Sequence, residues 1–189
     1  MGGVGKTVTA AGAASRASKS NTFPGGVFYL SGVPSLFESS LRSAVSSMAG
    51  IADFADEKDF NYVVDAVAGW LSHRGDPWLI VVDNVESASF VSGDLSPMLP
   101  GPQSNCRGVV LVTSRLRGSE LSTSGSWFAE VELGVMRKED GMELLRTRSS
   151  GYDSGRRLNT SDEQAAMSEV WAGVGGLPLA LDLAAKYVR

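Results

Sequence analysis

Met1-Gly2-Gly3-Val4-Gly5-Lys6-Thr7 is the stretch that decides the predicted fold, because it contains most of the phosphate-binding loop G-x-x-x-x-G-K-[ST]. Glycines let consecutive backbone N–H groups turn inward around phosphate oxygens, and the following helix adds its positive N-terminal end. In this pattern the lysine reaches the β- and γ-phosphates, and the threonine hydroxyl holds Mg²⁺. The predicted nucleotide-binding residues are Gly2, Gly3, Val4, Gly5, Lys6, Thr7 and Val8.

The loop pattern starts without its first glycine. In the full motif that glycine would stand one position before Met1, and a strand would come before the glycine. We therefore expect the sequence to be truncated, with an apolar strand ending in glycine encoded upstream. Reading the upstream coding sequence tests this expectation, and the absence of such a strand there would contradict it.

Composition and charge narrow the functional classes. Hydrophobic residues make up 43% of the 189 residues and charged residues 20%, which is ordinary for a globular protein with a buried core. The net charge of −4 argues against a nucleic-acid-binding surface. There is one cysteine, Cys106, and the sequence contains neither a membrane-spanning apolar run nor a signal-peptide pattern. These features predict a cytoplasmic protein without a membrane partner.

Apolar runs alternate with amphipathic helical patterns in the first two thirds of the chain. This alternation is typical of right-handed βαβ units and predicts an α/β fold of three αβα layers with a mostly parallel sheet. A continuous apolar run such as Trp78–Val82 suits a strand that is covered on both faces. The predicted strands are 27–30, 78–83, 108–115 and 128–133, and the predicted helices are 7–17, 34–48 and 60–71.

The remainder of the chain is predicted to be helical. Helices are expected at 138–148, from Thr160 or Ser161 to about 172, and at 177–188 with Pro178 near the start. We therefore divide the chain into a nucleotide-binding domain, 1–135, and the start of a helical subdomain, 136–189.

Asp83 follows four apolar residues, Leu79 to Val82, in the manner of a Walker B acid that faces the Mg²⁺ of a bound nucleotide. Open α/β sheets place ligands at the carboxyl ends of their strands. The next residue is Asn84, whose amide can position a water molecule but cannot accept its proton. Glu86 is an alternative base or simply an acid on an exposed turn. We therefore expect slow hydrolysis.

Arg115 ends the next predicted strand, where a guanidinium can contact a γ-phosphate. Thr113 and Ser114 precede it and could hydrogen-bond phosphate or water. For Arg115 the alternative is a solvated charge at the end of a strand.

Five motifs together resemble the NB-ARC family, the STAND-class P-loop ATPases of plant resistance proteins, apoptotic protease activating factors and bacterial regulators. They are Gly-Gly-Val-Gly-Lys-Thr, Phe23-Pro24-Gly25-Gly26-Val27-Phe28, Leu79-Ile80-Val81-Val82-Asp83-Asn84-Val85, Val112-Thr113-Ser114-Arg115 and Gly176-Leu177-Pro178-Leu179-Ala180-Leu181. The resemblance covers nearly the whole chain, and the last motif is the most specific because general P-loop proteins lack it.

The resemblance implies roles for particular residues. Lys6 and Thr7 would bind phosphate and Mg²⁺, Asp83 would be the Walker B acid, Arg115 the sensor, and Pro178 would pack on the adenine. It also places the expected upstream strand beside the strand that ends at Arg115. Asn84 departs from the aspartate that is commonest in plant and animal members, although Asp-Asn resembles bacterial-type relatives.

By resemblance, the chain is the switch module of a signalling ATPase that binds ATP or ADP with Mg²⁺. The family implies homo-oligomers in the ATP state and partners among other domains of the same polypeptide, including a winged-helix segment that is missing here. No Asn-Lys-x-Asp motif is present, so adenine is expected rather than guanine. Two alternatives remain open: a P-loop kinase acting on a small molecule, and a scaffold fragment that binds no nucleotide.

Overall fold

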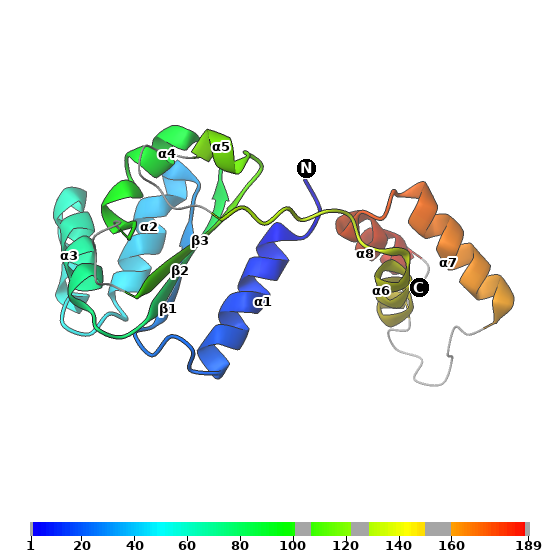
Figure 1. The fold of residues 1–189 in the computed structure, drawn as a ribbon, viewed down its shortest axis with the longest axis horizontal. Helices are drawn as coiled ribbons and strands as arrows, with labels where there is room; N and C mark the ends of the chain where they lie inside the picture. Colours follow the sequence, from blue (N-terminus) through cyan, green and yellow to red (C-terminus); the bar gives the residue numbers. More distant parts are fainter. Residues whose placement is uncertain (1, 101–106, 122–128, 150–159, 188–189) are drawn as a thin grey trace. The chain divides into compact units, whose positions relative to one another are not determined.

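The computed structural model describes residues 2–100, 107–121, 129–149 and 160–187. The chain divides into two compact units, Thr7–Glu130 and a smaller unit made of Met1–Lys6 with Val131–Arg189. Figure 1 shows the elements of each unit. Within the described ranges, no helix has both the length and the apolar character that crossing a membrane requires.

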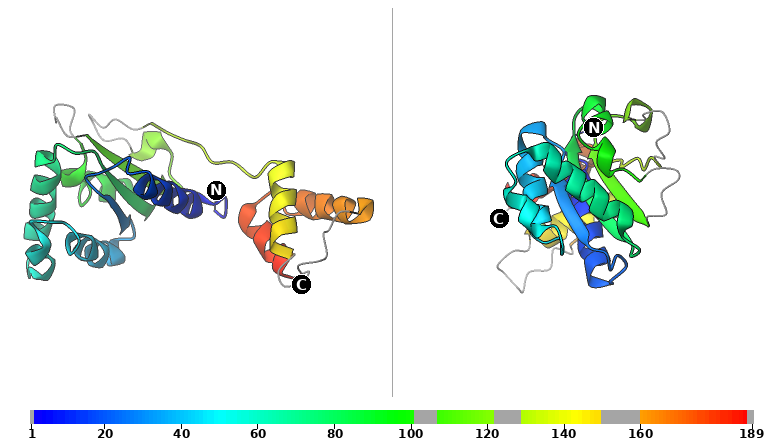
Figure 2. Two further views of the ribbon diagram at one scale, coloured as in Figure 1. Left: turned by 90° about the horizontal axis from the view of Figure 1, so that it is seen from below. Right: turned by 90° about the vertical axis from the view of Figure 1, so that its left-hand side faces the viewer.

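The larger unit is built on a sheet of three parallel strands in the order β1-β2-β3. The strands are β1 (Val27–Ser31), β2 (Trp78–Val85) and β3 (Gly108–Ser114), and Figure 2 shows them from two further directions. The register pairs Ser31 with Asp83 and Trp78 with Gly108. The α/β class and the parallel sheet are therefore confirmed.

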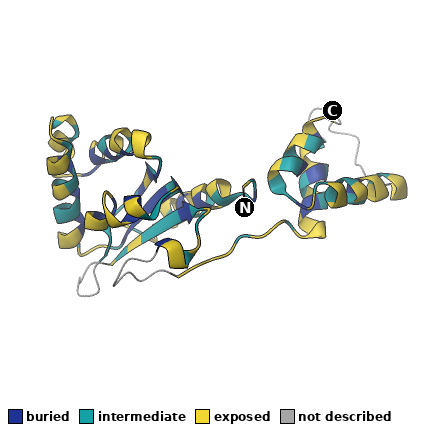
Figure 3. Cartoon of the chain, turned by 90° about the horizontal axis from the view of Figure 1, so that it is seen from above, coloured by how far each residue is buried: buried dark blue, intermediate teal, exposed yellow. Residues whose placement is uncertain are grey.

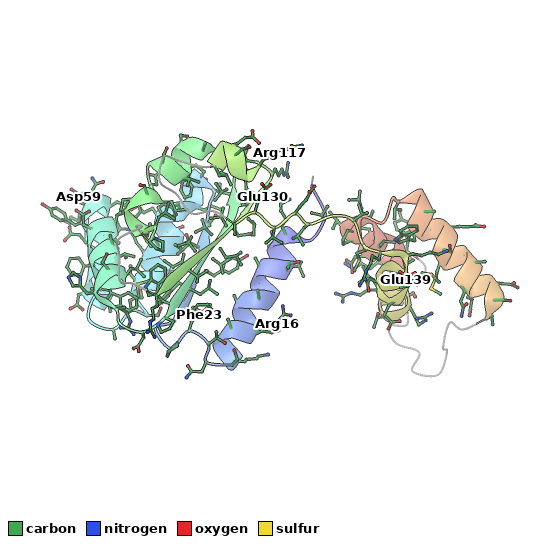
Figure 4. All side chains as sticks on the ribbon, in the orientation of Figure 1. Arg16, Phe23, Asp59, Arg117, Glu130 and Glu139 are labelled. Atoms are coloured by element: carbon green, nitrogen blue, oxygen red, sulfur yellow. The ribbon has the colours of Figure 1, made fainter. Side chains whose placement is uncertain are left out.

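Helices cover both faces of this sheet. Helix α1 (Lys6–Lys19) places Ala10 and Ala14 against Leu79 and Val81 of β2, and Phe23, labelled beside α1 in Figure 4, packs against this cluster. Small alanine side chains let a helix lie close to a sheet. The opposite face is covered by α2 (Pro34–Val45) and α3 (Phe60–His73), as Figure 1 shows. The arrangement is compatible with three αβα layers.

The main core lies between the sheet and α2 and α3. Strand β2 contributes Trp78, Ile80, Val82 and Val85 to it, and the whole run 78–82 is buried, as the sequence predicted. Figure 3 shows the burial of strands and inner helix faces against the exposed outer faces of the helices. Fully or nearly fully buried side chains of the core include Leu30, Leu41, Val45, Met48, Val63, Val67, Trp78, Ile80, Val82, Val91 and Leu95.

Four short helical elements were not predicted. They are η1 (Ala52–Asp56), α4 (Ala88–Ser92), η2 (Ser96–Met98) and α5 (Gly118–Leu121). Each is five residues or shorter, so none is long enough to show the 3.6-residue periodicity on which helix prediction depends.

The outer edge of β3 has no paired strand among the described residues. Strand β3 is paired with β2 on one side only. Val109 on β3 is 47% exposed. The predicted strand at 128–133 is wrong for 129–133, which is irregular, and Phe128 lies outside the described residues. In this stretch glutamates alternate with apolar residues and Val131 is 82% exposed, so no covered face holds it in a sheet.

The smaller unit contains three helices, α6 (Lys138–Ser149), α7 (Ser161–Gly173) and α8 (Pro178–Tyr187). Their apolar faces meet around Leu145, Met167, Leu181 and Ala185. Thr160 caps α7 in a reciprocal capping box with Glu163, which confirms one of the two predicted start positions. Pro178 occupies the first turn of α8, as predicted.

Gly175 and Gly176 form a matched pair for testing this unit, because both have positive φ, 62° and 66°. Gly175→Ala is expected to lower the free energy of unfolding by about 1 kcal/mol, the strain of a left-handed alanine. Gly176→Ala should lower it further, because its Cβ would lie 2.9 Å from the Met136 carbonyl oxygen and 3.0 Å from Trp171 Nε1. Urea unfolding of both variants measures the difference; equal losses would show that the contact with Met136 has no role.

Candidate functional site

Asp83 lies near the carboxyl end of β2, on the face of the sheet that α1 covers. Its side chain lies on the same face as those of Leu79 and Val81, which pack against α1. The sequence predicted that Asp83 would end the strand, but β2 continues to Val85 with an irregular register between Val82 and Val85. Asp83 is partly exposed.

Two hydroxyl groups donate hydrogen bonds to the same oxygen of Asp83. Thr7 Oγ1, in the first turn of α1, lies 3.0 Å from Asp83 Oδ1, and Thr113 Oγ1, on β3, lies 2.5 Å from it. Thr113 Oγ1 also accepts a hydrogen bond of 2.9 Å from the backbone N–H of Asn84. Thr113 is buried, and this accepted bond helps to direct its hydroxyl hydrogen toward Asp83.

Tyr29 is a third neighbour of Asp83, and no sequence motif pointed to it. Tyr29 on β1 pairs with Val81. Because Val81 and Asp83 share one face of β2, the Tyr29 side chain lies on the same face as Asp83. Burial raises the pKa of the Tyr29 phenol, and the charge of Asp83 and a hydrogen bond to that carboxylate raise it further. Asp83 thus has polar neighbours from α1, β1 and β3.

The raised pKa of Tyr29 predicts a loss of stability at high pH. The phenol binds its proton more tightly in the folded chain than in the unfolded chain, so its contribution is present below about pH 10 and is lost as pH rises through the folded pKa. Between about pH 9 and about pH 11, the wild type should therefore lose more stability than Tyr29→Phe. Urea unfolding at both pH values measures this, with Tyr62→Phe, an exposed tyrosine, as the control. Equal losses in wild type and Tyr29→Phe would contradict the prediction.

Asn84 has a left-handed backbone, with φ of 65°, directly after Asp83. Asparagine tolerates this conformation better than most residues. Its side-chain Nδ2 donates a 2.9 Å hydrogen bond to Glu86 Oε1. The amide of Asn84 therefore orients the carboxylate of Glu86, the only acid that the sequence analysis offered as an alternative base.

Arg115 follows β3 and is exposed. Among the described residues it makes no hydrogen bond or ion pair. Ser114 is instead structural, since its hydroxyl donates to the Val85 carbonyl at 2.7 Å and accepts from the Leu116 N–H at 3.0 Å. The structure therefore brings Thr7, Asp83 and Thr113 together without showing a contact from Arg115.

The glycine-rich loop has a left-handed backbone at two of its glycines and leads into a helix. Gly3 and Gly5 have positive φ, 75° and 93°, and α1 begins at Lys6. A Cβ on Gly5 would meet no atom within 4 Å, so the space above this residue is open. Val4 is buried. The loop therefore combines left-handed glycines with a helix N-terminus, two features of anion-binding backbone.

Leu179 of α8 contacts the loop within the smaller unit. Its backbone N–H donates a 3.2 Å hydrogen bond to the Gly3 carbonyl, and a Cβ on Gly3 would lie 3.4 Å from Leu179 Cβ. Pro178 immediately precedes this contact. Two of the predicted motifs, the glycine-rich loop and Gly-Leu-Pro-Leu, are therefore adjacent in space.

The described part of the chain contains no group of three or more histidine, cysteine, aspartate or glutamate side chains suited to a metal. The available oxygen donors are the Thr7 hydroxyl and the Asp83 carboxylate. Mg²⁺ is bound by few protein oxygens and otherwise by water and substrate phosphates. These two residues therefore fit a nucleotide-associated Mg²⁺ better than a metal held by protein alone.

Comparisons with known proteins give no identification. No protein-family model matches the chain, and no curated protein matches it either. The resemblance to NB-ARC domains therefore stays a prediction that is based on the five motifs.

Proposed function

We propose that this chain is an adenine-nucleotide-binding switch module that takes ATP or ADP with Mg²⁺. The observation that carries the proposal is the 3.0 Å hydrogen bond from Thr7 to Asp83, two residues that are 76 positions apart in sequence. Both residues are predicted Mg²⁺ ligands from separate sequence motifs. A random glycine-rich leader gives no reason for its threonine to meet an acid near the end of a buried strand.

The chemistry of the Thr7 hydroxyl supports a metal site. A hydroxyl has one hydrogen and two acceptor lone pairs, and Thr7 uses the hydrogen for Asp83. A lone pair of Oγ1 then remains for a cation, and the carboxylate beside it supplies negative charge. When bound, Mg²⁺ would neutralise charge on the nucleotide phosphates.

The phosphates are proposed to bind at the glycine-rich loop. Left-handed Gly3 and Gly5 and the start of α1 present backbone N–H groups, and Lys6 supplies a positive charge at the same turn. Pro178 is proposed to pack on the adenine, because the adjacent Leu179 contacts Gly3. The apolar ring of a proline offers a flat surface for a base.

Hydrolysis is proposed to be slow. Asn84 cannot accept a proton from water, and its amide is hydrogen-bonded to Glu86. Such a site suits a switch in which ATP and ADP stabilise different conformations and hydrolysis sets the lifetime of the ATP state. Arg115 is proposed to report the γ-phosphate, which ATP has and ADP lacks. Homo-oligomers in the ATP state belong to the same proposal.

Asp83→Asn tests the proposed site. Calorimetric titration should show that wild type binds ATP more tightly with Mg²⁺ than with EDTA, and that Asp83→Asn loses most of this difference. Asp94→Asn, which changes an exposed acid of the same unit, is the control and should behave as wild type. If wild type binds neither ATP nor ADP, the nucleotide-free scaffold is correct; if it phosphorylates a small acceptor, the kinase is correct.

A further inference from the structure

We infer that Thr113 is a positioning residue that holds the Asp83 carboxylate from the neighbouring strand β3, so that the carboxylate faces the cation of a bound nucleotide. The inference rests on the proposed function, and it gives Thr113 a role at Asp83 in place of the expected hydrogen bond to phosphate or water. Strands β2 and β3 are paired, so Thr113 approaches Asp83 from the adjacent strand.

The Thr113 side chain is buried, and its hydroxyl makes two hydrogen bonds. It is the one buried polar residue found in the described part of the chain, with 8% of its surface exposed. Its oxygen accepts the Asn84 N–H at 2.9 Å, and its hydrogen is donated to Asp83 Oδ1 at 2.5 Å. A hydroxyl that is fixed at both ends also fixes the carboxylate rotamer that it contacts.

The same hydrogen bond links the carboxylate to the backbone of the next residue. Asn84 has its left-handed φ of 65° where the β2–β3 register becomes irregular. This local turn directs the Asn84 N–H at Thr113. The backbone after Asp83 is therefore held by the same hydroxyl as its side chain.

Thr7 supports the carboxylate from a second element. Its hydroxyl, in the first turn of α1, donates to the same Oδ1 as Thr113, so two donors from α1 and β3 set the orientation of the Asp83 carboxylate. A carboxylate held in this way needs little reordering when a cation arrives.

The test separates cation binding from nucleotide binding. ATP affinity is measured by calorimetry with Mg²⁺ and with EDTA for wild type, Thr113→Val and Thr113→Ser. Thr113→Val keeps the shape of the side chain and removes the hydroxyl, so it should reduce the Mg²⁺-dependent gain in affinity by about tenfold. Thr113→Ser, which retains the hydroxyl, should restore the gain. Affinity in EDTA should stay close to wild type in both variants.

Equal losses with Mg²⁺ and with EDTA would show a merely structural role and would overturn the inference, as would an unchanged gain in Thr113→Val. Wild type that binds no ATP in either buffer refutes the proposed function and the Mg²⁺ role together, whereas a wild type that shows the Mg²⁺-dependent gain while Thr113→Val keeps the same gain refutes the inference alone.

Discussion

Lys6→Ala is expected to weaken the binding of Mg·ATP by about 100-fold, which corresponds to about 3 kcal/mol. Lys6 is the first residue of α1, directly after left-handed Gly5, and it supplies the charge at the turn where the phosphates are proposed to bind. Hydrogen bonds to charged groups are worth more than neutral ones, and the β- and γ-phosphates carry most of the nucleotide's charge. Isothermal titration of ATP with Mg²⁺ at a fixed salt concentration measures the loss.

Lys19→Ala is the matched control, because Lys19 is exposed in the last turn of the same helix. Both variants remove one positive charge from α1, so a general effect of net charge would weaken binding equally in the two. We expect Lys19→Ala to stay within about twofold of wild type, since exposed charges act weakly at a distance in salt. Unchanged affinity in Lys6→Ala would refute the assignment of the phosphate site.

Trp78→Ala is expected to destabilise the larger unit by about 4 kcal/mol. Trp78 is 1% exposed, its indole Nε1 donates a 3.2 Å hydrogen bond to the Leu71 carbonyl, and its ring covers Gly108 on β3. A Cβ on Gly108 would lie 2.0 Å from the Trp78 ring, so the glycine makes room for the tryptophan at their paired position. The substitution leaves a large cavity between β2, β3 and α3.

Urea unfolding followed by far-ultraviolet circular dichroism measures this loss. Tyr62→Ala, which removes another aromatic side chain from the same unit, is the control, because Tyr62 is 61% exposed on α3. Its expected effect is below about 1 kcal/mol. A loss of that small size in Trp78→Ala would show that the ring is not part of the core.

Much of the fold followed from residue patterns because the relevant signals are local. The apolar run at 78–82 predicted a strand covered on both faces, and the periodic apolar residues of α3 predicted a long helix with one buried side. The strand prediction failed at 129–133 because alternation of glutamates and apolar residues indicates a half-covered strand, and none of residues 129–133 is buried. Coverage is a property of the tertiary structure, and local sequence does not contain it.

The site shows the same division between local and long-range information. Thr7 and Asp83 each belong to a short motif, so both were selected from sequence, and the hydrogen bond between them agrees with that selection. Tyr29 was treated only as part of a buried strand, although it is 42% exposed. Its closeness to Asp83 depends on the register that pairs Ser31 with Asp83. No motif encodes that register. The alternation of side chains along β1 shows which residues share a face, but it does not show which face lies on the side of Asp83.

The most direct test of the central claim uses Mn²⁺ in place of Mg²⁺, because both prefer octahedral oxygen ligands and Mn²⁺ is paramagnetic. Amide signals of the isotopically labelled chain are recorded with Mn·ATP, and the broadening of each signal reports its distance from the metal. We predict the strongest broadening at Thr7 and Asp83, with Tyr29 and Thr113 next. Strong broadening elsewhere with these four signals unchanged, or no broadening at all, would contradict a nucleotide-associated metal site at Thr7 and Asp83.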